Sequence, residues 1–170
     1  MRNIEIKAEY PNLKHAEELS FKIGAQFQWR RKQVDTYFNV NQGRLKLRET
    51  ENEPAELIGY FRENIPQSRE SRYQRLAVEN NEELKMMLSE NLGVSIVVAK
   101  IRKLYLYKNI RIHLDEVDNL GNFIEFEGVL NKGENEPDTN QCLHDLQARF
   151  EIGKDDLVSV SYSDLLFQLK

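Results

Sequence analysis

The feature that most constrains the fold is a series of segments in which apolar and polar residues alternate. In the first, residues 3–10, Ile4, Ile6 and Ala8 fall on one side and polar residues on the other. Such alternation predicts a strand that is buried on one face. Further strands are predicted near residues 33–40, 44–50, 56–62, 72–78, 95–107, 109–117 and 122–130.

Short turns, such as the one at Asn41-Gln42-Gly43, join most of these strands and favour an antiparallel sheet. Helical spacing of apolar residues predicts helices between Asn12 and Gly24, over 81–92, over 138–150 and near 161–168. Eight antiparallel strands can close into a barrel, which hides the strand edges. We therefore predict an α+β fold, in which a closed eight-stranded antiparallel β-barrel is flanked by helices.

Composition limits the size and setting of this fold. The chain has 170 residues, 40% of them hydrophobic, which suits a single domain over residues 1–170. A net charge of −4 argues against a DNA- or RNA-binding protein, because such domains are usually basic. The single cysteine, Cys142, excludes an intramolecular disulfide and is expected to be a small core residue. With no signal-like or membrane-spanning run, we expect a cytoplasmic protein without a membrane partner.

Positive side chains recur on one face of the predicted strands. Arg44, Lys46 and Arg48 are two residues apart and share a face, opposite Leu45 and Leu47. A solvated face explains the alternation, but neighbouring like charges destabilise a sheet unless something compensates them. The alternative is a large anion, such as a polyphosphate, held by Arg and Lys. Comparable positions on other strands are held by Lys7, Arg62, Arg72, Lys100, Arg102 and Arg111.

Acidic residues occur beside these cations. Glu125 and Glu127 share a face of one strand, Asp115 lies in the strand before it, and Glu5 accompanies Lys7 in the first strand. Carboxylates would repel a phosphate unless a metal ion bridged the two, as Mg²⁺ or Mn²⁺ does. The other interpretation is that these acids form salt bridges with the cations. For some residues both interpretations can hold together.

Other chemistry is less well supported by the sequence. His113 is a candidate general base, although a single histidine in a strand is more often a hydrogen-bonded structural residue. Trp29, Tyr37 and Phe38 are expected in the core or at the barrel rim rather than as a base-stacking platform. The chain has no glycine-rich phosphate loop, so side chains would have to hold a phosphate. No set of residues identifies adenine.

Several of these segments together resemble a known family. Residues 3–7 (NIEIK) resemble the Glu-x-Glu-x-Lys signature of the CYTH superfamily, also called triphosphate tunnel metalloenzymes. The chain is most similar to class IV adenylyl cyclase-like members. Further blocks of similarity are 33–38 (QVDTYF), 43–49 (GRLKLRE), 100–102, 111–127 and 162–166.

The resemblance implies a tunnel of eight antiparallel strands that binds a triphosphate together with Mg²⁺ or Mn²⁺. It makes Lys7, Arg48 and Arg111 the catalytic candidates. The implied metal ligands are Glu5, Asp115, Glu125 and Glu127. The implied phosphate-binding residues are Lys7, Arg44, Lys46, Arg48, Arg62, Arg72, Lys100, Arg102 and Arg111.

Three functions follow from the resemblance and stay open at this point. The first is an adenylyl cyclase that converts ATP to cyclic AMP and pyrophosphate. The second is a triphosphatase that hydrolyses inorganic, thiamine or nucleoside triphosphate. The third is a non-catalytic nucleotide- or polyphosphate-binding protein, because Asn3 stands where the signature has its first glutamate and offers a carbonyl oxygen without charge. A homodimer is expected from family likeness alone.

Overall fold

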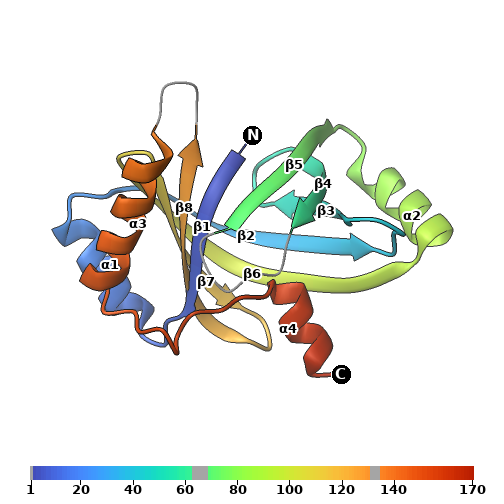
Figure 1. Ribbon diagram of the computed structural model, residues 1–170. Coiled ribbons are helices and arrows are strands. Elements are labelled where there is room, and N and C mark those ends of the chain that lie inside the picture. The colour runs from blue at the N-terminus through green and yellow to red at the C-terminus, as the bar shows by residue number, and fades with distance from the viewer. Residues whose placement is uncertain (1, 63–68, 131–134) are drawn as a thin grey trace.

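The computed structural model describes residues 2–62, 69–130 and 135–170, and of residues 2, 61, 62 and 69–73 it describes the backbone alone. Its strands are β1 (Arg2–Glu9), β2 (Gln26–Phe38), β3 (Arg44–Thr50), β4 (Ala55–Arg62), β5 (Arg69–Val78), β6 (Val94–Tyr107), β7 (Ile110–Val117) and β8 (Gly121–Leu130). Its helices are α1 (Leu13–Lys22), α2 (Asn81–Leu92), α3 (Glu136–Arg149) and α4 (Tyr162–Gln168) (Figure 1). The predicted α+β fold, with eight strands and flanking helices, is confirmed.

All the strand pairs are antiparallel, and their order is β1-β5-β4-β3-β2-β6-β7-β8. Because β8 also pairs with β1, the order returns to its start and forms a closed barrel. Two strand starts differ from the prediction: β5 begins at Arg69 and not near residue 72, and β2 begins at Gln26 and not near residue 33. In β2, a register shift between Phe27 and Trp29 interrupts the alternation of inward and outward side chains. The sequence pattern therefore does not show where this strand begins.

Polar caps define where the helices begin. The Asn12 side chain accepts a hydrogen bond from the His15 backbone N–H (3.1 Å) at the start of α1. Asn80 accepts one from the Glu83 N–H (3.2 Å) at the start of α2. At α4, Ser161 and Asp164 cap each other's backbone N–H groups. Each cap satisfies a donor that has no partner within the helix.

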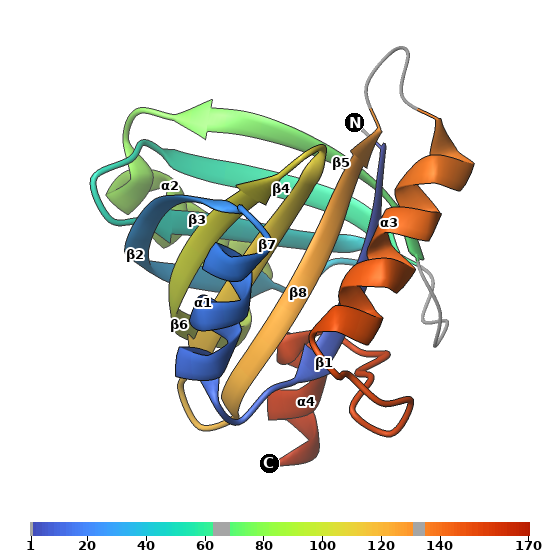
Figure 2. The same cartoon turned by 90° about the vertical axis from the view of Figure 1, so that its left-hand side faces the viewer.

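The main core lies outside the barrel, between the sheet and helices α1 and α3 (Figure 2). Gly128 of β8 lets α3 approach closely, because a Cβ atom there would collide with Thr139. Cys142 is partly buried against this core, close to its predicted place. Fully buried members of the core include Ile112, Ile124, Phe126, Leu143, Leu146 and Phe150.

Two smaller clusters complete the packing. Leu84 and Leu88 of α2 cover Phe38 and Leu47 on the outside of β2 and β3. Tyr162 of α4 packs against a third cluster that includes Phe123. Because α1, α2 and α3 cover the outer surface, the inward-facing side chains of the strands are left to surround an interior space. None of the helices in the described parts of the chain has the length and apolar character that a membrane crossing requires.

Candidate functional site

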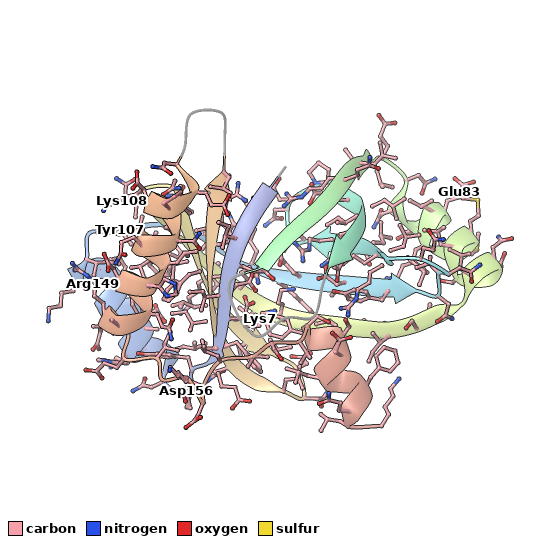
Figure 3. All side chains as sticks on the ribbon, in the orientation of Figure 1. Lys7, Glu83, Tyr107, Lys108, Arg149 and Asp156 are labelled. Carbon is pink, nitrogen blue, oxygen red and sulfur yellow. The ribbon has the colours of Figure 1, made fainter. Side chains whose placement is uncertain are left out.

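The inner faces of the strands surround a cavity of about 530 Å³. Lys7 lies within the barrel, whereas Glu83, Arg149 and Asp156 lie at its periphery (Figure 3). The charged strand faces noted in the sequence therefore line a shared cavity inside the barrel and do not form an ordinary flat, solvated surface. The lining cations are Lys7, Arg31, Lys46, Arg48, Arg75, Lys100, Arg102 and Arg111, and the lining acids are Glu5, Asp35, Glu53, Glu56, Glu125 and Glu127.

One wall of the cavity is organised around a single acid, Asp35 of β2, which is 2% exposed. Arg48 donates to both carboxylate oxygens, from Nε to Oδ1 (2.7 Å) and from Nη2 to Oδ2 (2.8 Å). Lys46 Nζ donates to Oδ2 at 2.8 Å, and Lys100 Nζ lies 3.4 Å from the same oxygen. We call these four residues the Asp35 cluster. One negative charge here faces three positive charges, so the cluster retains an excess of positive charge.

Burial and neighbouring charge act against each other within the Asp35 cluster. Burial raises the pKa of Asp35, but the positive charges of Arg48, Lys100 and Lys46 hold it well below its usual value. Burial also lowers the pKa of Lys100 to about 7, with the charges of Arg48 and Arg102 adding to the effect against the attraction of Asp35. An additional anion near Lys100 would stabilise its protonated form.

A second ion pair fixes Arg102 beside this cluster. Arg102 donates from Nε and Nη2 to the two oxygens of Asp115, each at 2.6 Å. The Tyr162 hydroxyl donates to Asp115 Oδ2 at 2.8 Å, and the Tyr162 ring lies 4.3 Å from Lys7 Nζ. Asp115 is fully buried and is not among the residues that line the cavity. The structure therefore places this predicted metal ligand in a pair that orients Arg102.

One predicted phosphate-binding residue, Arg44, lies apart from the cavity lining. Arg44 donates to both oxygens of Asp164 (3.0 and 2.9 Å) and to Ser161 Oγ (2.6 Å), which ties α4 to β3. Arg44 does not line the cavity. The side chains of Arg62 and Arg72 lie outside the part of the chain that the structure describes.

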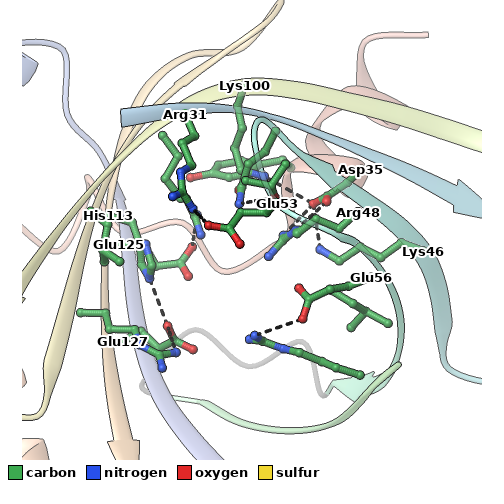
Figure 4. A pocket seen from close by; sticks show the side chains of 18 of the residues that line it. Arg31, Asp35, Lys46, Arg48, Glu53, Glu56, Lys100, His113, Glu125 and Glu127 are labelled. Carbon is green, nitrogen blue, oxygen red and sulfur yellow. Dashed lines mark hydrogen bonds and ion pairs between the residues drawn. The ribbon is translucent and has the colours of Figure 1, made fainter. Parts of the chain in front are cut away.

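The opposite wall carries carboxylates from β1 and β8, namely Glu5, Glu125 and Glu127, which we call the carboxylate group. Figure 4 shows Glu125 and Glu127 across the cavity from Asp35. The pairing register sets Glu5 opposite Glu127 and Lys7 opposite Glu125. Lys7 Nζ lies 3.5 Å from Glu125 Oε2. Thus the predicted residues of these two strands do meet in one place.

Glu127 is the best defined member of the carboxylate group. His113 Nε2 lies 3.0 Å from Glu127 Oε2, Arg111 Nη1 lies 3.4 Å from that oxygen, and the Asn3 amide donates to Oε1. Burial raises the pKa of Glu127, but the hydrogen bond and charge of His113, together with Arg111, lower it to about 2. Glu127 is therefore ionised at neutral pH. His113 is hydrogen-bonded and 5% exposed, as expected for a structural residue.

The donor atoms of the carboxylate group suit a hard divalent cation. Carboxylate oxygens, with the amide oxygen of Asn3 on the same strand face, are the ligand type that Mg²⁺ and Mn²⁺ prefer. In the described parts of the chain, no three His, Cys, Asp or Glu side chains converge closely enough to form a complete protein metal site. Mg²⁺ does not require one, because it commonly takes one or two carboxylates and fills its other positions with substrate phosphates and water.

Sequence reasoning missed Asp35, although two signals pointed to it. Strand alternation puts Asp35 on the same face as Gln33 and Tyr37, and antiparallel pairing puts it opposite Arg48. Trp29 and Tyr37 line the cavity, Trp29 beside the register shift in β2. Tyr162, which belongs to α4, also lines the cavity. No local sequence pattern indicates that this helix contributes a side chain to the site.

Several known proteins are similar to this chain over nearly its whole length. A Methanocaldococcus jannaschii protein, provisionally named an adenylate cyclase, is 24% identical over 97% of this chain and 98% of its own length. The PH1012 protein of Pyrococcus horikoshii OT3 superposes with a TM-score of 0.84 at 20% identity, over 96% of this chain and 98% of that one. A Vibrio parahaemolyticus protein, also provisionally an adenylate cyclase, gives a TM-score of 0.80 at 21% identity and 97% coverage of both chains.

A more distant plant protein adds a second activity to this set of names. The Hippeastrum protein HpAC1, a provisional adenylyl cyclase described as having a dominant triphosphatase activity, gives a TM-score of 0.70 at 12% identity. The alignment covers 99% of this chain and 96% of the plant chain. The family model described as the CYTH domain matches residues 1–162. The chain therefore belongs to the CYTH domain family.

Proposed function

We propose that this protein is a divalent-metal-dependent enzyme that acts on a triphosphate, with an adenylyl cyclase-like reaction that converts ATP to cyclic AMP and pyrophosphate. One observation carries the proposal: the Asp35 cluster, with its excess positive charge, faces the carboxylate group across a single cavity. A phosphate chain complements the first wall, and a metal ion that binds phosphate complements the second.

The Asp35 cluster supplies the anion-binding half of this proposal. Lys46, Arg48 and Lys100 share one carboxylate, so each retains capacity for charge-assisted hydrogen bonds to phosphate oxygens. Because these side chains are already held in place by Asp35, binding a phosphate orders few new groups. Arg102, fixed by Asp115, adds a further positive charge to the same wall.

The carboxylate group supplies the metal-binding half. One or two of its carboxylates, from among Glu5, Glu125 and Glu127, would hold Mg²⁺ or Mn²⁺, with phosphate oxygens and water as the other ligands. When bound, the metal ion acts as a Lewis acid on phosphoryl oxygens. Lys7 and Arg111, which lie beside Glu125 and Glu127, would neutralise phosphate charge next to this group. His113 would keep Glu127 oriented and ionised.

In the cyclase reaction, the ribose 3′-oxygen bonds to the α-phosphorus while its proton passes to water. The bond from that phosphorus to the α,β-bridging oxygen breaks, and pyrophosphate leaves with the electron pair. The positive side chains Arg48, Lys46 and Lys100 would stabilise the negative charge that develops on pyrophosphate.

Hydrolysis of the terminal phosphate is the second candidate, and the triphosphatase activity named for the Hippeastrum protein favours it. The same cavity would serve, with water attacking the terminal phosphorus and phosphate released. The two reactions differ in which phosphorus lies beside the carboxylate group.

Product analysis tests these proposals. The protein is incubated with Mg²⁺ or Mn²⁺ and, separately, with ATP, thiamine triphosphate and inorganic triphosphate, and the products are identified by chromatography. Cyclic AMP and pyrophosphate from ATP are the expected products. Orthophosphate without cyclic AMP would replace the cyclase with a triphosphatase. Binding without turnover of any of these compounds would leave a non-catalytic triphosphate-binding protein.

A further inference from the structure

The charged walls account for the phosphates and the metal, but part of the cavity lining is of another kind. Trp29 of β2 and Leu104 of β6 are paired in register and line the cavity together, both partly buried. Neither side chain carries a charge that would attract a phosphate, and neither has an atom that would bind a hard metal ion. This part of the lining needs a different explanation.

A β-bulge directs Trp29 into the cavity. Phe27 and Trp29 are two residues apart and would share a face in a regular strand. The register shift between them places Trp29 opposite Leu104, whereas Phe27 lies opposite Tyr105 and contacts its ring on the outer side of the barrel. Bulges re-aim side chains in this way. The local irregularity of β2 therefore adds an aromatic ring to the cavity.

The Trp29 ring is held in place on one side. The Arg31 guanidinium lies 5.0 Å from the ring centroid, and Arg31 in turn forms an ion pair with Glu53. The guanidinium covers one face of the indole, so a planar group entering from the cavity can stack on the other. Rings held in advance bind a stacking partner with little loss of conformational freedom.

Gln33, two positions beyond Arg31 on the same strand face, supplies an independent sign of a ligand. Its side chain lines the cavity, is 5% exposed, and donates from Nε2 to Thr50 Oγ1 at 3.1 Å. Its other amide atom, Oε1, is buried and has no hydrogen-bond partner among the described residues. A buried acceptor without a partner is costly, and a ligand O–H or N–H group would satisfy it.

A fully ionised inorganic triphosphate has neither a planar ring nor a hydrogen-bond donor, so it would leave both features unused. A nucleoside has both: a base with a π-face, and sugar hydroxyls or base N–H groups that donate. We propose that Trp29 and Gln33 form a subsite for the nucleoside part of a nucleoside triphosphate, with the base stacked on Trp29 and a donor of the nucleoside bonded to Gln33 Oε1. This inference rests on the proposed triphosphate site.

Trp29 is the only tryptophan in the chain, so its fluorescence reports directly on this subsite. The wild-type protein with Mg²⁺ is mixed rapidly with ATP or with inorganic triphosphate, and emission is read before turnover. Binding of both ligands is measured in parallel by calorimetry. We expect ATP to quench the emission strongly and inorganic triphosphate to change it little. Equal emission changes with the two ligands, or ATP binding without any change, would overturn the inference.

Substitutions separate the subsite from the phosphate site. Trp29→Leu should weaken ATP binding about tenfold and leave inorganic triphosphate binding unchanged, because a base–aromatic stack is lost. Gln33→Leu should weaken ATP binding several-fold, again without affecting inorganic triphosphate. Phe27→Leu is the matched control, since this aromatic residue is 48% exposed and on the other side of the bulge. It should change neither affinity.

The outcomes distinguish this inference from the proposed function. Loss of ATP affinity alone in Trp29→Leu supports the subsite. Unchanged ATP affinity in both Trp29→Leu and Gln33→Leu, with inorganic triphosphate still bound, overturns the subsite and leaves the triphosphate site intact. Binding of neither ligand by the wild-type protein would overturn the proposed function and this inference together.

Discussion

Two walls of the same cavity arise from the same alternation of strand residues but differ in their balance of acidic and basic side chains. On the wall formed by β2, β3 and β6, Lys46, Arg48 and Lys100 share one carboxylate partner, Asp35. On the wall formed by β1 and β8, three glutamates gather, and Glu127 accepts from the neutral Asn3 amide as well as facing Arg111. The first wall has too few acids for its cations, and the second is rich in acids.

This difference teaches that the cavity is not simply a network of matched salt bridges. A protein interior that only had to be stable would pair its charges completely, because an unpaired buried charge is strongly unfavourable. Segregated charge is instead what a ligand with its own charges requires.

The largest effect is expected for Asp35→Asn. It leaves two buried cations, Lys46 and Lys100, and the partly buried Arg48 without their shared counter-charge, and should lower the free energy of unfolding by about 3–5 kcal/mol. Urea unfolding with and without inorganic triphosphate measures this, and the ligand should recover much of the loss. A variant as stable as the wild type would show that Asp35 does not hold the cations together.

The carboxylate wall is tested by Glu127→Gln, which keeps the shape of the side chain and removes its charge. Metal affinity should fall at least about tenfold, read both as Mn²⁺ binding by electron paramagnetic resonance and as the metal concentration for half-maximal activity. Glu116→Gln, on the exposed outer face of β7, is the control. An identical metal titration for both variants would remove Glu127 from the metal site.

The pH dependence of ligand binding sharpens the comparison for the Asp35 wall. The pKa of Lys100 is lowered from 10.5 to about 7 by burial first and by nearby arginines second. Between these two pH values the unfolded chain holds a proton that the folded chain has lost, so this residue makes stability rise with pH across that window. Triphosphate affinity should instead fall, by about tenfold from pH 7 to 9, because the neutral amine loses its charged hydrogen bond.

The substitution Lys100→Arg separates the loss of the proton from Lys100 from proton loss by the triphosphate itself. Arginine stays protonated throughout the range, so the affinity of the variant should depend less on pH than that of the wild type. Calorimetric titrations of both proteins at each pH measure the slopes. Equal slopes would mean that Lys100 does not titrate at the site.

The smallest effect is expected at the cavity rim. Glu53 is exposed and pairs with Arg31, and exposed ion pairs contribute little to stability. Glu53→Gln should therefore change the free energy of unfolding by less than about 1 kcal/mol, measured by the same urea titration. A loss comparable to that of Asp35→Asn would erase the distinction between buried and rim charges.

Most of the fold could be predicted from the sequence, because strand alternation and helix caps are local signals. Asn12 caps the helix that follows it, and the alternation of Ile4, Ile6 and Ala8 marks a single strand, so each signal lies within one short segment of the sequence. The start of β2 could not be predicted, since the bulge between Phe27 and Trp29 is defined by pairing with β6. Bulges depend on a partner strand that the local sequence does not identify.

The site could be predicted only in part. Alternation placed Lys46, Arg48 and Lys100 on one inner face, and the structure brings them together. Alternation could not show that Asp115 forms an ion pair with Arg102, because that contact depends on the register between β6 and β7. Strand alternation puts Asp35 on the inner face, but its pairing with Arg48 likewise depends on a register, that of β2 with β3.

Calorimetric titration of inorganic triphosphate in the presence of Mg²⁺ tests the central claim most directly. Three proteins are compared: the wild type, Arg48→Met in the Asp35 cluster, and Lys103→Met as the control. Lys103 lies on the outer face of β6 and pairs with Glu17 of α1. The account predicts binding by the wild type and Lys103→Met and a loss of about 100-fold in Arg48→Met, as expected for charge-assisted hydrogen bonds. No binding by the wild type, or equal binding by all three proteins, would contradict it.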